Sequence, residues 1–68
     1  MGGMDPEKAV AEAQHTIGCM YERGQGVPRL EAEALFWYRL AAKRGHAAAI
    51  GSEMRLEMKH LFPKTGTG

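Results

Sequence analysis

The chain has 68 residues, a single cysteine, and 9 Lys and Arg against 8 Asp and Glu. This composition rules out a disulfide within the chain and argues against a basic nucleic-acid surface; no apolar run approaches the roughly 18 residues of a membrane span. A chain this short forms one small domain that buries roughly 60% of its unfolded surface, so it is only marginally stable alone.

The first predicted helix begins after Asp5, whose side chain can cap the free backbone N–H groups, with Pro6 at the first helical position. Gly18 lies in mid-helix, where glycine costs about 1 kcal/mol relative to alanine. We expect close approach of another helix to compensate for this cost. Gly24 and Gly26 predict the end of the helix and a loop. Apolar residues at helical spacings form the predicted packed stripe, which consists of Val10, Ala13, Ile17, Met20 and Tyr21.

The second predicted helix extends from about Arg29 or Leu30 to Arg44, and Gly45 ends it. Its start signal is weak, because the side chain of Leu30 cannot cap backbone N–H groups. The residues predicted to pack lie on one broad face and are Ala34, Trp37, Tyr38, Ala41 and Ala42.

Phe36 lies off this broad face of the second helix. Together with Leu40, four residues further on, it would form an exposed apolar patch. We predict that this patch contacts a partner. The alternative is that Phe36 packs against a terminal segment such as Phe62.

The third predicted helix extends from about His46 to Leu61 or Phe62, and Pro63 stops it. No segment alternates apolar and polar residues as a strand would, so the predicted class is all-α. The predicted packed stripe of this helix is Ile50, Met54, Met58 and Leu61, and its predicted solvent-facing residues are Glu53, Arg55, Glu57 and Lys59.

Short connections that contain glycine predict antiparallel packing of consecutive helices. The predicted architecture is therefore a helical hairpin followed by a third helix, in a single domain over residues 5–62. The two ends, residues 1–4 and 63–68, are rich in Gly and Thr with little to pack, and we expect them to be disordered.

A weak internal repeat aligns residues 11–14 with residues 47–50, at a period of about 36 residues that is typical of helical-hairpin solenoids. The pattern over about residues 9–50 resembles the Sel-1-like repeat, a relative of the tetratricopeptide repeat. The resemblance implies an α–α solenoid of right-handed type and a non-catalytic module that binds another protein as an adaptor or scaffold subunit. It depends on Ala11-x-Ala13-Gln14, Gly18-x-x-Tyr21, Gly24-x-Gly26-Val27, Ala34-x-x-Trp37-Tyr38, Ala41-Ala42 and Gly45-His46-Ala47.

The third helix departs from the repeat pattern, because Glu53 and Glu57 stand where the first helix has Ile17 and Tyr21. A polar substitution on the next stacking face predicts a C-terminal capping helix. The N-terminal side has no such cap, so we expect self-association through it or a tightly bound partner. An alternative function is therefore a self-associating structural subunit, or the cap of a larger assembly.

The resemblance places partner binding on the inner face made by the first helices of the repeats. The predicted binding residues are Glu12, His15, Cys19, Glu22, Ser52 and Arg55, with Phe36 and Leu40 as an added contact. A further alternative is metal binding or redox sensing through His15 and Cys19, which share a helical face. Two ligands are too few for a closed zinc site, and no orienting group for Cys–His catalysis is visible.

These observations predict a protein partner of unknown identity, without a cofactor, nucleic acid, membrane or enzymatic activity. The single thiol fits a reducing compartment, and the N-terminus lacks the basic and apolar parts of a signal peptide. We therefore expect a cytoplasmic protein, provided that no targeting segment has been removed.

Overall fold

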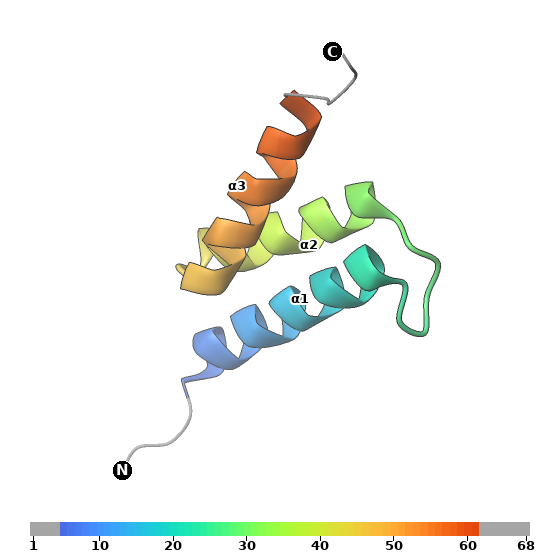
Figure 1. Cartoon of the computed structure of the whole chain (residues 1–68). Helices are drawn as coiled ribbons and strands as arrows, with labels where there is room; N and C mark the ends of the chain where they lie inside the picture. Colours follow the sequence, from blue (N-terminus) through green and yellow to red (C-terminus); the bar gives the residue numbers. More distant parts are fainter. Residues whose placement is uncertain (1–4, 62–68) are drawn as a thin grey trace.

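The computed structural model describes residues 5–61, which form three helices packed in chain order (Figure 1). Helix α1 spans Pro6–Arg23, α2 spans Glu31–Lys43 and α3 spans Ala47–Leu61. The described part contains no strand, which confirms the predicted all-α class. The predicted disordered ends and Phe62 lie outside the described residues.

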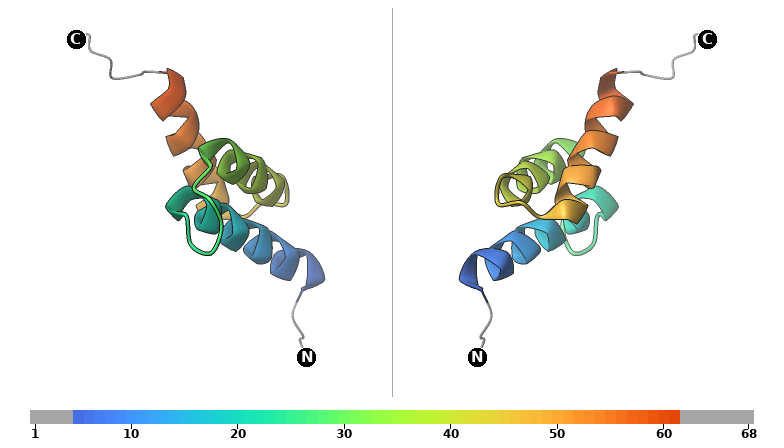
Figure 2. Two further views of the ribbon diagram at one scale, coloured as in Figure 1. Left: turned by 90° about the vertical axis from the view of Figure 1, so that its right-hand side faces the viewer. Right: turned by 90° about the vertical axis from the view of Figure 1, so that its left-hand side faces the viewer.

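Helices α1 and α2 run antiparallel as a hairpin, and α3 lies across α2 and extends away from α1 (Figure 2). This arrangement confirms the predicted hairpin with a third helix packed on it. Among the described helices, none combines the length and the apolar composition that crossing a bilayer requires.

Local signals set the ends of the helices where the sequence predicts them. Oδ1 of Asp5 accepts a hydrogen bond from the Glu7 N–H at 3.1 Å, which caps α1. Gly24 ends this helix with φ 72°, and its N–H donates to the Met20 carbonyl at 2.7 Å. Leu30 precedes α2 without any side-chain cap, as its chemistry requires.

The core consists of two small clusters that depend on close approach between helices. A Cβ added to Gly18 would lie 2.7 Å from two ring carbons of Tyr38 and 3.2 Å from the Ala34 carbonyl oxygen. The close approach predicted for Gly18 is thus confirmed, and α2 is the helix that approaches. The buried residues of the two clusters are Ala11, Ala41 and Ala49 in one, and Ala34, Tyr38 and Leu56 in the other.

The predicted packed stripe of α1 is partly wrong. Tyr21 packs against the core as expected, but Val10 is 42% exposed and Ala13 is also exposed. The buried residues of this helix are Ala11 and Gly18, because α2 packs closely only where side chains are small. The prediction followed the larger apolar residues and so missed the face of closest approach.

The predicted packed stripe of α3 is wrong. Ile50, Met54 and Met58 are 40%, 56% and 54% exposed, whereas Ala49 and Leu56 are buried. The side chain of Leu61 is not among those described. These exposed residues form a row at spacings of four on the side of α3 turned away from the core, and we call them the α3 apolar row.

Two acidic residues predicted to face solvent instead turn toward α2. Arg39 on α2 pairs with Glu53 at 3.5 Å and with Glu57 at 2.9 Å. Arg55 and Lys59, which were also predicted to face solvent, are each 55% exposed, so the outer side of α3 is partly polar. Part of its acidic charge lies against α2, and its outer side carries the α3 apolar row.

Candidate functional site

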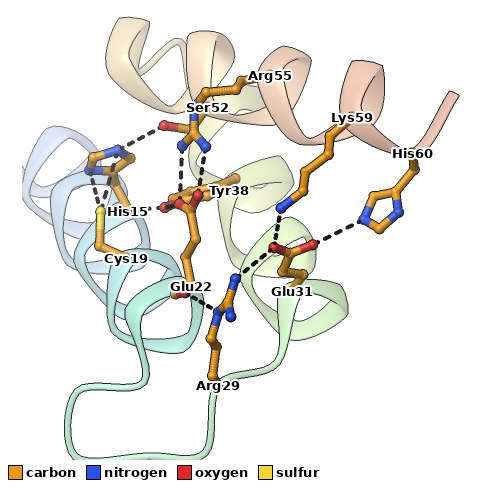
Figure 3. Close-up of polar contacts among 10 residues, drawn as sticks. All are labelled: His15, Cys19, Glu22, Arg29, Glu31, Tyr38, Ser52, Arg55, Lys59 and His60. Carbon is orange, nitrogen blue, oxygen red and sulfur yellow. Dashed lines mark hydrogen bonds and ion pairs between the residues drawn. The ribbon is translucent and has the colours of Figure 1, made fainter. Parts of the chain in front are cut away.

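Most of the predicted partner-binding residues converge where α1 and α3 both lie against Tyr38 of α2 (Figure 3). We call this region the seam. Its members share hydrogen bonds or close contacts that cross between helices. They are His15, Cys19 and Glu22 from α1, Tyr38 from α2, and Ser52 and Arg55 from α3.

Glu22 is the central acceptor of the seam. It accepts a hydrogen bond from the Tyr38 hydroxyl at 2.6 Å and two from the Arg55 guanidinium at 2.6 and 3.0 Å. The Arg55 hydrogen bonds lower the pKa of Glu22 to about 2. Burial, followed by hydrogen bonding to Cys19 and Glu22, raises the pKa of Tyr38. At neutral pH the seam therefore holds an ionised carboxylate and a neutral phenol.

His15 lies in the seam beside Cys19 and Ser52. The Cys19 sulfur is 4.0 Å from Nδ1 and 3.9 Å from Nε2, and these nearly equal distances place the thiol off the lone-pair axis of either nitrogen. Nε2 lies 3.5 Å from the Ser52 hydroxyl on α3. Burial, and then the neighbouring His46, lower the pKa of His15, which favours a neutral imidazole at pH 7.

A family model described as the Sel1 repeat matches residues 11–46. The chain belongs to the Sel1 repeat family. The matched segment starts within α1, contains α2 and ends just before α3, so the hairpin is the repeat and α3 follows it. Comparison with the curated proteins and with the solved structures found no match. Sel1 repeats are helical repeats that usually take part in protein binding, and the family is typically non-catalytic.

The structure does not support the alternative that His15 and Cys19 bind a metal ion. Within residues 5–61, no group of three or more His, Cys, Asp or Glu is placed to hold a metal ion. His15 and Cys19 are adjacent, but zinc sites in proteins use at least three protein ligands at about 2.0 to 2.3 Å. The Cys19 sulfur instead lies 3.4 Å from the Tyr38 hydroxyl, within the packed centre of the Sel1 repeat.

Three of the predicted binding residues lie outside the seam. Glu12 is exposed and lines an open cleft between the start of α1 and the turn before α3. Phe36 on α2 is 53% exposed and stands edge-on to Trp37, with ring centroids 5.4 Å apart. Leu40 is half-buried. Glu12 was predicted on the same inner face as the seam residues but lies apart from them, whereas Phe36 and Leu40 were predicted as an added contact on α2.

Sequence reasoning missed a second polar cluster, centred on Glu31 at the start of α2. This carboxylate pairs with Lys59 at 2.7 Å, with Arg29 at 3.3 Å and with His60 at 3.4 Å. The cluster ties the end of α3 to the loop and to the start of α2. An acidic first turn in α2 and a basic last turn in α3 are the sequence signal that could have indicated it.

The α3 apolar row was also missed as a surface. In the internal alignment, Met54 stands at the position of Gly18, on the face of α1 that α2 covers. The described chain has no helix in the corresponding place beside α3. That alignment was the available signal that the row would remain uncovered.

Proposed function

We propose that the chain is a non-catalytic protein-binding module that acts as an adaptor or scaffold subunit. The observation that carries this proposal is the α3 apolar row, in which Ile50, Met54 and Met58 are 40 to 56% exposed. A contiguous apolar surface is typical of an interaction site, and methionine side chains adapt to partners of different shape. Membership of the Sel1 repeat family supports the same function.

The edges of the α3 apolar row provide charges on both sides. Arg55 and Lys59 directly follow Met54 and Met58, and their side chains are each 55% exposed. Glu53 and Glu57 precede the same methionines and are less exposed, because Arg39 holds them against α2. We propose that a partner packs on the row and makes polar contacts along the basic edge, where the row meets the seam.

Substitution of Met54 by glutamate tests this proposal. The side chain is 56% exposed, so we expect Met54→Glu to leave the fold intact and to weaken capture of a partner by at least roughly tenfold. The measurement is affinity capture from the source cell on immobilised chain, followed by titration of the captured protein. Phe36→Glu on α2 and His15→Glu in the seam locate any contribution from those surfaces.

The three variants give distinct outcomes for the binding proposal. Loss of capture with Met54→Glu alone places the site on the α3 apolar row. Loss with Phe36→Glu or His15→Glu alone moves it to α2 or to the seam. Unchanged capture with all three variants contradicts each of these surfaces.

A second candidate function is self-association as a structural subunit, which we propose on the exposure of α1. Val10 is 42% exposed, and the neighbouring Ile17 is only partly covered. We expect the apparent mass in light scattering after gel filtration to rise with concentration, and Val10→Glu to abolish that rise. Glu12→Gln on the same helix serves as the control. A monomer at every concentration rules this candidate out.

A further inference from the structure

Two imidazole rings meet where α1 approaches the start of α3. The centroids of His15 and His46 are 4.9 Å apart, and the ring planes differ by 27°. His46 directly precedes α3, and its Nδ1 accepts a hydrogen bond from the Ala49 N–H at 3.1 Å. The ring therefore caps the first turn of α3. Because Nδ1 can accept only without a proton, this geometry requires a neutral His46.

His15 contacts both other helices from its place on α1. Its ring packs against Tyr38 of α2 at a centroid distance of 5.3 Å, and its Nε2 lies 3.5 Å from the Ser52 hydroxyl of α3. Burial and the nearby His46 lower the pKa of His15, while Glu22 acts in the opposite direction. The arrangement of the three helices thus favours a neutral ring here as well.

The charged groups around this pair come from every neighbouring element. Residues at the start of α1 and in the turn before α3 bring positive and negative charges to the cleft beside His46. Arg44 pairs with Glu7 there at 3.8 Å. Within the seam, Arg55 keeps Glu22 ionised, because it lowers the pKa of Glu22 to about 2. The titratable groups around the pair are Asp5 just before α1, Glu7, Lys8, Glu12, Cys19 and Glu22 from α1, Tyr38 from α2, Arg44 from the turn, and Arg55 from α3.

We propose that His15 and His46 form a proton-sensitive latch that holds α3 against α1 when both rings are neutral and releases it when they are protonated. Protonation of His46 at Nδ1 removes the acceptor of the Ala49 N–H. It also places a positive charge at the positive end of the α3 dipole. Charge on both rings adds repulsion across their 4.9 Å separation.

Release of this latch would change the seam. Ser52 and Arg55 are on α3, whereas their partners His15 and Glu22 are on α1. Separation of the two helices would therefore break the contacts that assemble the polar face next to the α3 apolar row. We infer that the seam is assembled at neutral pH and opens in acid.

The sign of the pH dependence follows from the lowered pKa of His15. An imidazole in an unfolded chain titrates at about 6.5, and a ring held neutral in the closed state binds its proton less tightly than that. The contribution of the latch is therefore complete above about pH 6.5 and is lost as the pH falls below it.

A titration of the full chain from pH 7.5 to 5.0, followed by NMR, tests the latch without any substitution. We expect the Ala49 amide resonance to shift with the same midpoint as the His46 ring. We also expect the hydrogen-exchange protection of the first turn of α3 to fall by about tenfold. The proposal would be overturned if the Ala49 amide resonance did not shift as the His46 ring titrates. Constant hydrogen-exchange protection across this pH range would also overturn it.

Variants separate the latch from a general acid effect. His46→Asn retains a capping side chain that does not titrate, and His15→Gln replaces the other ring with a neutral amide. In the double variant, we expect the change in the unfolding equilibrium between pH 7.5 and 5.0 to fall from about tenfold to under about twofold. His60→Gln, at the other end of α3, should retain the wild-type change. A double variant that also retains it overturns the latch.

Discussion

Replacement of Gly18 by alanine is expected to destabilise the protein by about 2 kcal/mol, which lowers the unfolding temperature by roughly 10 °C. In an ordinary helix the same exchange would stabilise by about 1 kcal/mol, because alanine has the higher helix propensity. The expected sign is reversed because the new methyl group has no room. It would lie 2.7 Å from ring carbons of Tyr38 and 3.2 Å from the Ala34 carbonyl oxygen.

The groups that surround Gly18 cannot easily move to make room for a methyl group. Tyr38 is fully buried, and its hydroxyl is held by Glu22 at 2.6 Å, so its ring cannot swing away without breaking the seam. The Ala34 oxygen belongs to the backbone of α2, so it moves only with that helix. Relief of the clash therefore requires α1 and α2 to separate, which also loosens the small-residue packing between them.

Gly51 provides a matched control for Gly18→Ala. It lies within α3, and a Cβ added there would meet nothing within 4 Å. We expect Gly51→Ala to stabilise the chain by about 0.5 to 1 kcal/mol, through helix propensity and a less flexible unfolded state. Urea unfolding followed by circular dichroism measures both variants. Equal effects of one sign would contradict the close contact between α1 and α2.

The ends of the helices could be predicted because their signals are local. Asp5 caps α1 and Gly24 ends it through hydrogen bonds to residues two to four positions away. The buried face of α2 was also predicted correctly, since Ala34, Tyr38 and Ala41 are all buried. This helix packs against both neighbours, so its apolar residues face the core over a broad arc.

The buried faces of α1 and α3 could not be predicted by the same reasoning, because each packs mainly against α2 and depends on where that helix lies. On α3 the row with the most apolar residues is exposed, whereas Ala49 and Leu56 on the packed side are buried. The apolar periodicity of α3 indicates that the helix has an apolar row. It does not indicate whether another helix covers that row. Close packing selects small residues, which a search for large apolar residues overlooks.

The candidate site was predicted in part, because the sequence indicates which residues share a face but not which contacts form between helices. The family resemblance put His15 and Glu22 on the same inner face as Arg55, and the structure brings these three into the seam. The sequence pattern indicates Tyr38 as a core residue, but it does not reveal that the hydroxyl of this buried ring bonds to Glu22. The contact between His46 and His15 was also missed, since it depends on a turn that places one ring over the other.

Replacement of Leu56 by alanine is expected to cost about 3 kcal/mol, because the change leaves a cavity among fully buried residues. Leu56 is fully buried and packs with Ala34 and Tyr38. In a chain of this length, such a loss is a large fraction of the total free energy of unfolding. Part of the population should therefore be unfolded at 25 °C. The measurement is the urea midpoint of unfolding, with wild-type chain in parallel.

Met54→Ala is the matched control for Leu56→Ala, because it shortens a similar side chain on the same helix. Met54 is 56% exposed, so we expect its truncation to change stability by less than about 0.5 kcal/mol. The comparison decides which side of α3 faces the core, since the sequence pattern alone predicts the larger loss at Met54. If Met54→Ala cost more than Leu56→Ala, α3 would pack through its apolar row. That row would then be unavailable to a partner, and the binding proposal would fail with it.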